Sequence, residues 1–341
     1  MIEIVLAFLF LSVLFYLVFA GADFGVGILE LFSRMKNKRI TKLAAYRIIG
    51  PVWEANHIWL ILCIVILWIA FPYYYNIIVT QLHIPITLLL VGIIGRGTAF
   101  VFRHYDAYRG QSQWWYDVVF QLSSLVSVFF VGVCAGALVS GEMIHPNDVA
   151  GKTFLDLYVY TWLNPFAILM GYFMIALTAF IAAVFLSGDT VGQEYRFYLA
   201  KARRTNIYLL VFGGLIFIES YIAQRQILQL LLDNPLFFIL FVVVGLLFIP
   251  IWRSLLKGNK MLPGFVMALQ LFLILFVWSL LAFPNLIFVK NATVSILDNA
   301  SPDSVFNVLG FSLLFAAVFV LPGLYHLFRT FGLLKARKSR G

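Results

Sequence analysis

Two acidic side chains lie inside apolar stretches of the sequence, where a charge has strong chemical consequences. Asp23 belongs to the segment GADFGVG (21–27), and Glu54 belongs to GPVWEANHIWLI (50–61). A carboxylate inside a membrane is costly unless it is neutralised, paired or hydrated, and such residues usually mark ion or proton routes. The two carboxylates therefore indicate either positions on a proton path or buried groups bonded to a neighbouring helix.

A third acid shares a helical face with Asp23. Seven residues return a helix to almost the same angle, so Asp23, Gly27 and Glu30 fall on one stripe. Glu30 lies near the mouth of this predicted span and Asp23 lies deeper, so we expect both to belong to the same path. Gly21 and Gly25 fall on the opposite side, where a small-xxx-small pattern lets another helix approach closely.

Polar residues accompany Glu54 into the second apolar segment. Pro51 is a helix-start signal, and the helix dipole alone could account for an acid in the first turn. However, Trp53, Asn56 and His57 enter the membrane with Glu54. We expect these three residues to support the proton path.

Two arginines are spaced to share a face at the end of the third predicted span. Arg96 and Arg103 lie seven residues apart in GRGTAFVFRHYDAYRG (95–110). Either they pair with membrane carboxylates, or their side chains extend to lipid phosphates at the membrane surface. We include both among the supporting residues of the path.

The sixth predicted span has a polar outer half. A polar face is expensive against lipid, so we expect it to meet protein or water. The candidates for contact with another subunit are Glu219, Gln224, Arg225 and Gln226.

Metal and haem ligation are not expected of this chain. We expect His83 and His145 on the outer side and His104 and His326 near the inner side, which leaves His57 as the one histidine expected deeper in the membrane. A bis-histidine haem needs a second ligand at the same depth. The two cysteines, Cys63 and Cys134, fall inside predicted spans and are too few for a zinc site by themselves. We expect them to be small buried hydrophobic residues.

The composition is that of an integral membrane protein. Of 341 residues, 63% are hydrophobic and 11% are charged, and the mean hydropathy is +0.98. Soluble domains average about 25% charged residues, and a run of about 20 apolar residues is enough to cross a bilayer. The net charge of +9 does not indicate nucleic-acid binding, because the basic residues lie in short loops between apolar spans.

The apolar runs predict nine transmembrane helices in a single all-α membrane domain, residues 1–341. The predicted spans are 4–32, 52–74, 78–101, 116–140, 161–187, 205–232, 235–253, 262–284 and 304–328. All lysines and arginines except Lys152, Arg225 and Lys290 fall on one side of this arrangement. The positive-inside rule then places the N-terminus outside and the C-terminus in the cytoplasm.

Several short segments, taken together, resemble subunit II of the cytochrome bd quinol oxidases. They follow that family's order and cover most of the chain: GADFGVG (21–27), GPVWEANHIWLI (50–61), GRGTAF (95–100), LNPF (163–166), FPN (283–285) and NASP (299–302). The chain departs from the family pattern at Glu54, where many members carry Asp, and at His57, where Glu or Gln is usual.

The resemblance implies a complex in the bacterial cytoplasmic membrane that oxidises quinol and reduces oxygen to water. It implies two b-type haems and one d-type haem in a partner, subunit I, and none ligated by this chain. Further expected partners are membrane lipids and a small single-span accessory subunit, but not nucleic acid. The resemblance also implies two four-helix bundles with a peripheral ninth helix, and a cytoplasmic proton route that uses Asp23 and Glu54.

Two other functions fit parts of the sequence. A stand-alone proton-coupled transporter also needs intramembrane carboxylates, and often shows inverted repeats with broken helices. No such repeat is evident in the sequence. A structural scaffold would hold the same carboxylates fixed in pairs. Co-purification of a haem-bearing partner would favour the oxidase, and a colourless lone protein would favour the transporter.

Overall fold

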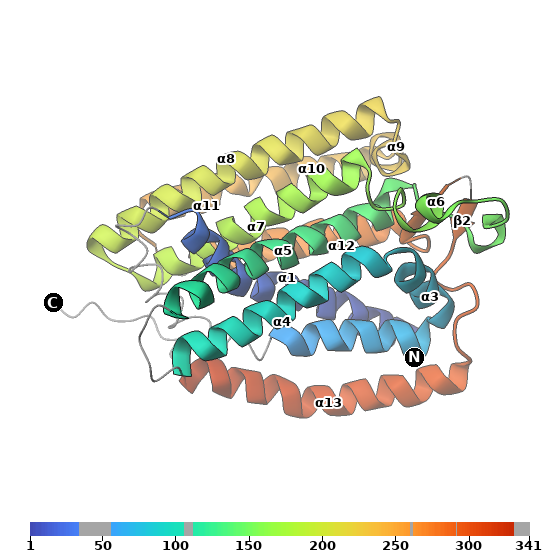
Figure 1. Cartoon of the computed structure of the whole chain (residues 1–341), viewed down its shortest axis with the longest axis horizontal. Helices are drawn as coiled ribbons and strands as arrows, with labels where there is room; N and C mark the ends of the chain where they lie inside the picture. The colour runs from blue at the N-terminus through green and yellow to red at the C-terminus, as the bar shows by residue number, and fades with distance from the viewer. Residues whose placement is uncertain (34–55, 106–111, 260–261, 291, 331–341) are drawn as a thin grey trace.

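Long apolar helices lie side by side along the longest axis of the molecule (Figure 1). The computed structural model describes residues 1–33, 56–105, 112–259, 262–290 and 292–330. A helix satisfies its own backbone hydrogen bonds, which a lipid environment requires of every spanning segment. The predicted all-α membrane fold is confirmed, and in these five ranges the strands are limited to one short hairpin.

Eight helical segments of the described chain are long and apolar enough to cross a membrane. They are α1 (Ile2–Leu31), α4 (His83–Tyr105), α5 (Ser112–Ser140), α7 (Pro165–Asp189), α8 (Gly192–Ile222), α10 (Pro235–Leu246) taken with α11 (Phe248–Leu256), α12 (Leu262–Ala282) and α13 (Asp303–Thr330). A ninth candidate is a broken pair, the helix Asn56–Ala70 and α3 (Pro72–Gln81), bent by 120°. If this bent pair is counted as one span, the described chain has nine candidate spans, which is the predicted number.

The second and third predicted spans have different boundaries in the structure, because residues 72–81 form a separate helix. The sequence predicts a second span to residue 74 and a third from residue 78. Instead, the chain bends at Phe71, runs through α3 and begins α4 at His83. Pro72 lies in the first turn of α3, where its missing N–H is tolerated, whereas it would interrupt a continuous helix.

The predicted sixth span, 205–232, is also different in the structure. Helix α8 begins earlier, at Gly192, and ends at Ile222, and a separate helix α9 (Gln226–Asp233) follows. Gln224 has a φ of 50°, in the left-handed region that interrupts a helix. The early start adds polar and basic residues, many of them good helix formers, to the N-terminal end of α8.

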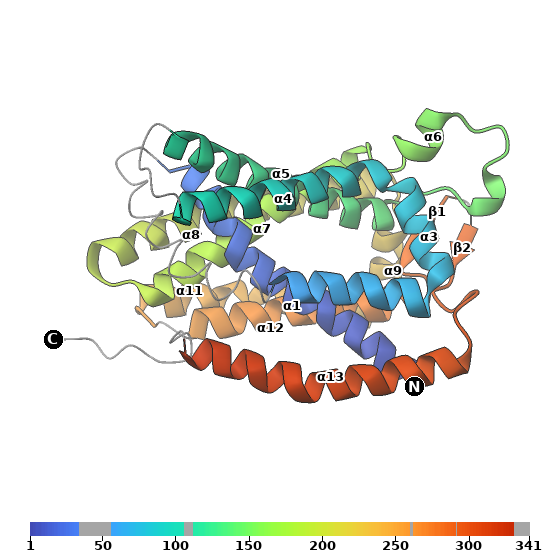
Figure 2. The ribbon, with the colours of Figure 1, turned by 60° about the horizontal axis from the view of Figure 1, so that its bottom comes forward.

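Short elements gather at one end of the bundle (Figures 1 and 2), where the sequence predicts the loops 141–160 and 285–303. They are a 3-10 turn (Pro146–Asp148), α6 (Phe154–Tyr158), β1 (Ile287–Val289) and β2 (Ala292–Val294). The two strands pair antiparallel, a hairpin that the apolar pattern does not predict. The backbone N–H of Ile287 donates to the Tyr74 hydroxyl at 2.5 Å, which attaches the hairpin to α3.

Helix α13 runs along one side of the bundle in both views (Figures 1 and 2). It begins at the same end as α1, and a Cβ added at Gly310 would lie 3.3 Å from Sδ of Met1. Helix α1 starts and α13 finishes at opposite ends of the bundle, as an odd number of crossings requires. The division into two four-helix bundles with a peripheral ninth helix stays a prediction.

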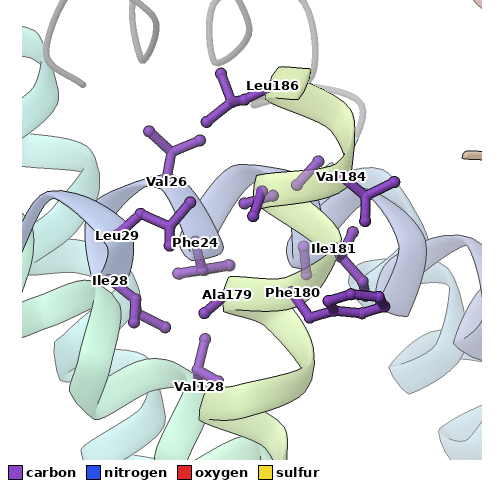
Figure 3. Packing of buried hydrophobic residues seen from close by; sticks show 14 of the residues in the cluster. Phe24, Val26, Ile28, Leu29, Val128, Ala179, Phe180, Ile181, Val184 and Leu186 are labelled. Carbon is purple, nitrogen blue, oxygen red and sulfur yellow. The ribbon is translucent and has the colours of Figure 1, made fainter. Parts of the chain in front are cut away.

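The largest core cluster lies where α1 packs against α7 (Figure 3). Val26 of α1 and Ile181 of α7 are both 0% exposed. A Cβ added at Gly25 would meet the backbone carbonyl of Thr178 and would lie 2.7 Å from Cβ of Ala182. The small-residue face predicted for the first span is therefore the surface on which α7 packs.

We expect Gly25→Ala to lower the thermal stability of the protein, because the added methyl group must displace the backbone of α7. Overpacking of this kind costs about 1–3 kcal/mol. Gly214→Ala in α8 is the matched control, since no atom lies within 4 Å of a Cβ added there. Thermal unfolding in detergent measures both variants, and equal stability of the two would contradict the close packing of α1 on α7.

Candidate functional site

Asp23 of α1 forms a buried ion pair with Arg96 of α4. Nη2 of Arg96 lies 2.6 Å from Oδ1 of Asp23 and donates to the Asp23 backbone carbonyl at 3.1 Å. The two side chains are 0% and 1% exposed. Nε of Arg96 donates to Oγ of Ser124 on α5 at 3.2 Å. The pair therefore joins three helices, and Arg96 pairs with a carboxylate instead of extending to lipid.

A second ion pair lies seven residues further along both helices. Nη2 of Arg103 lies 2.6 Å from Oε1 of Glu30, and both side chains are 1% exposed. Nε of Arg103 lies 2.7 Å from Oδ1 of Asp117 in the first turns of α5. The side-chain amide of Gln121 donates to the same Glu30 oxygen at 3.0 Å. Arg103 is thus held by two carboxylates inside the protein.

Phe120 of α5 lies between the two guanidinium groups. The Cζ atoms of Arg96 and Arg103 lie 5.0 and 4.9 Å from the centre of its ring. Seven residues advance a helix by about 10.5 Å, so the two cations flank the ring along the helix direction. A cation–π contact is stronger when the cation is desolvated. We call Asp23, Arg96, Glu30 and Arg103 the ion-pair row.

Small residues bring α1, α4 and α5 close enough for these contacts. A Cβ added at Gly27 of α1 would lie 2.7 Å from Cβ of Ser124. One added at Gly95 of α4 would lie 2.7 Å from Oγ of Ser123. Gly27 falls between the two carboxylates of α1, so α5 approaches α1 at the position where both arginines must be enclosed.

Asn56 brings the second predicted span to the same site. Its Nδ2 donates to Oδ2 of Asp23 at 3.5 Å, and Asn56 is 0% exposed. His57, the next residue, is half-buried. Trp53 and Glu54 lie outside the described residues, so their roles stay predictions.

Several buried polar atoms of this site have no hydrogen-bond partner among the residues that the structure describes. They are Nη1 of Arg96, Oε2 of Glu30 and Oδ1 of Asn56. Buried polar atoms are mostly satisfied by protein or by ordered water. Arginine keeps its proton in proteins, whereas a carboxylate can gain and release one. The site can therefore hold fixed positive charge beside exchangeable acids, with positions open to water.

Sequence reasoning missed the contribution of α5 to this site. Asp117, Phe120, Gln121 and Ser124 all contact the ion-pair row. Their spacing of three, four and seven residues places them on one helical face. This spacing could have predicted the contact from the sequence, because polar residues that recur on one face of an apolar span indicate a buried polar contact.

The polar residues of the predicted sixth span form a separate ion network. Arg225 lies 2.8 Å from Glu142 and 2.8 Å from Glu219. Glu219 and Arg225 are therefore paired within this chain, and burial by another subunit is not needed to explain them. Gln224 and Gln226 are exposed, and contact with another chain stays a prediction for this region.

In the described ranges, the His, Cys, Asp and Glu side chains form no group of three or more that could hold a metal ion. Cys63 and Cys134 are free thiols of intermediate burial. That this chain ligates neither haem nor metal stays a prediction.

Comparison with known proteins identifies one family and several relatives. The family model described as "Cytochrome bd terminal oxidase subunit II" matches residues 1–331. Cytochrome bd ubiquinol oxidase subunit 2 of Bacillus subtilis is 29% identical over 54% of this chain and 53% of that protein. Cytochrome bd-I ubiquinol oxidase subunit 2 of Escherichia coli K12 is 26% identical over 63% of this chain and 58% of that protein. The matches span a little over half the length of these curated relatives.

A solved structure, that of bd oxidase from Geobacillus thermodenitrificans, contains a chain with the same fold. The TM-score is 0.78, and the superposition covers 98% of this chain and 99% of that one. The sequence identity is 19%, so this similarity concerns the fold alone.

We expect Arg103→Gln to destabilise the protein more than Glu30→Gln. Loss of the Arg103 charge leaves Glu30 and Asp117 without their common cation, whereas loss of the Glu30 charge leaves Arg103 paired with Asp117. Breaking a buried pair costs about 3–5 kcal/mol when the remaining charge is uncompensated. Thermal unfolding measures the difference, with Arg203→Gln, at an exposed position of α8, as the control. A larger loss for Glu30→Gln would argue against this charge arrangement.

Proposed function

The chain belongs to the cytochrome bd terminal oxidase subunit II family, and we propose that it is the non-haem-ligating subunit of a bacterial quinol oxidase. The match of the family model to residues 1–331 is the observation that supports this proposal. The proposed complex oxidises quinol and reduces oxygen to water. Two b-type haems and one d-type haem are proposed for the partner, subunit I. A stand-alone transporter is not favoured, because the relatives are named as oxidase subunits.

Reduction of oxygen to water consumes protons, and oxidation of quinol releases them. We propose that quinol protons leave on the outer side, while the protons for water enter from the cytoplasm. Charge is then separated across the membrane without a pump. This arrangement needs a proton path through apolar protein from the cytoplasmic side.

Glu30, Asp23 and Glu54 are the proposed carboxylates of that path. Glu30 lies one residue from the end of α1 at Leu31, and Asp23 lies about 10.5 Å deeper at the rise of an α-helix. The paired arginines keep their own protons, so the moving proton is carried by the carboxylates and by water between them. Asn56, which bonds Asp23, is proposed to help hold that water.

Weakly buried helix faces are the proposed surfaces for subunit I, lipid and a small accessory chain. In the apolar 18-residue stretch of α8, 17% of the residues are buried within this chain. In the corresponding stretch of Pro235–Leu256, 11% are buried. Inside a membrane, such faces meet either lipid or another apolar helix. We propose that one of them packs on subunit I and stabilises it.

Replacement of the carboxylates tests the path and the function together. The wild-type complex should purify with a haem-bearing partner and reduce oxygen with quinol. Asp23→Asn and Glu54→Gln keep the side-chain shape but cannot carry a proton. We expect oxygen consumption per haem to fall roughly tenfold or more in both variants, with an unchanged haem spectrum. The yield of the Asp23→Asn complex should fall as well, because buried Arg96 loses its carboxylate partner.

Asp148→Asn, in an exposed turn, is the control for these variants and should turn over normally. If the carboxylates are only structural, yield and haem content fall together and the surviving complex turns over at the wild-type rate. Normal turnover in both variants with intact haem would rule out the path. Purification of this chain without a haem-bearing partner would contradict the proposed function.

The proposed orientation places the N-terminus outside and the end of α13 on the cytoplasmic side. We expect Lys152→Cys, between the 3-10 turn and α6, to react with a membrane-impermeant maleimide on intact spheroplasts. Lys257→Cys, at the end of α11, should react only after permeabilisation. The reverse pattern would place Glu30 at the outer surface and would be incompatible with proton uptake through it.

A further inference from the structure

An apolar cavity lies between α9, α10 and α12, away from the ion-pair row, and we call it the slot. Its volume is about 190 Å³. On α12 its wall includes Ile274, Val277 and Leu281, which recur every three to four residues and therefore lie on one face of the helix. Seven residues advance a helix by about 10.5 Å, so the slot runs along the axis of a membrane-spanning helix. Lipid acyl chains in a bilayer run in roughly the same direction.

The slot opens to the outside of the bundle between α10 and α12. Two residues of its wall, Phe241 of α10 and Ile274 of α12, are 46% and 42% exposed. Deeper in the wall, Val244 and Val277 are only 4% and 7% exposed. An apolar cavity of about 150 Å³ stays dry and accepts benzene. The slot is larger than that and equally apolar, so it suits a hydrocarbon occupant.

Trp278 supplies one polar group to the slot. Its ring is part of the wall, and its Nε1 is buried without a hydrogen-bond partner among the residues that the structure describes. An indole N–H can only donate, and a buried one usually has an acceptor. Trp278 lies four residues before the end of α12 at Ala282, about 6 Å from the end of that span. Tryptophan at this level of a membrane lies beside the lipid headgroups.

Helix α9 covers the slot at the end of the bundle that also carries β2 (Figures 1 and 2). Ile227 and Leu231 of α9 line the slot, and they lie one turn apart on the same face of that helix. An occupant therefore enters from the side, between α10 and α12, where the wall is exposed.

We propose that the slot binds one acyl chain of a diacyl phospholipid from the leaflet next to α9, and that Nε1 of Trp278 donates to the ester carbonyl of that chain. A phospholipid carries this carbonyl at the headgroup end of each chain. One molecule thus places its acceptor beside Trp278 and its hydrocarbon in the slot. The inference requires only that the chain spans a membrane, so it is independent of the proposed proton path.

Photolabelling of the intact complex in nanodiscs tests the slot. The probe is a phosphatidylcholine with a diazirine in the middle of one acyl chain, and we expect its label on Val244 and Val277. Ile274→Trp places a larger side chain at the open side of the slot and should remove most of this label. Ile239→Trp is the matched control, because Ile239 is 57% exposed on α10 outside the slot wall. This variant should keep the label.

A change of lipid linkage tests the hydrogen bond separately. Phosphatidylcholine with ether-linked chains keeps the hydrocarbon and lacks the carbonyl. On dilution into detergent, it should leave the wild-type complex roughly two- to tenfold faster than the ester lipid, the range for one lost hydrogen bond. In Trp278→Phe both lipids should leave at the same, faster rate, because the donor is absent. Mass spectrometry of the complex at successive times measures the lipid that remains bound.

Several outcomes would overturn the inference. Absence of label from Val244 and Val277 in the wild type, or equal label in Ile274→Trp and Ile239→Trp, would overturn the site. Equal release of the ester and ether lipids from the wild type would overturn the role of Trp278. A high-resolution density map that shows an isoprenoid quinone or a side chain of another subunit in the slot would overturn the choice of phospholipid. None of these results depends on the turnover of Asp23→Asn, which tests the proton path by itself.

Discussion

The burial of two guanidinium charges inside an apolar helix bundle is the constraint on which this site depends. A charge taken out of water costs several kcal/mol even after relaxation, so each buried cation needs a carboxylate and further hydrogen bonds. Arg96 and Arg103 obtain these from α1 and α5, and both contact the Phe120 ring. Helix α5 reaches this position because Gly27 of α1 has no side chain. Charge pairing and close packing are therefore interdependent here.

The same constraint creates conditions in which protons can move. The arginines supply fixed positive charge, and the carboxylates beside them are the groups that can exchange protons. Polar atoms without protein partners occur at Glu30 and Asn56 within the described ranges, and such atoms favour bound water. In the proposed function, the carboxylates and bound water carry protons through protein that excludes bulk water.

The helical repeat explains how much of this site the sequence predicts. Asp23 and Glu30 lie seven residues apart on a long apolar helix, and their common face does not depend on where the helix ends. Pairing with the arginines stayed open because it joins residues 73 positions apart, and a single sequence does not reveal which faces meet. The break after α8 was missed for a related reason, since Arg225 is held by Glu142, 83 positions away. The bend at Pro72 depends on local backbone chemistry that an average of hydropathy does not record.

Proton uptake by the intact complex during a single turnover tests the central claim most directly. The fully reduced complex, in vesicles with a pH indicator on the cytoplasmic side, is exposed to oxygen by flash photolysis of bound carbon monoxide. Haem oxidation and proton uptake are recorded together. For Asp23→Asn we expect proton uptake to slow roughly tenfold or more, while the first haem oxidation keeps the wild-type rate. Proton uptake at the wild-type rate in this variant would contradict a proton path through Asp23.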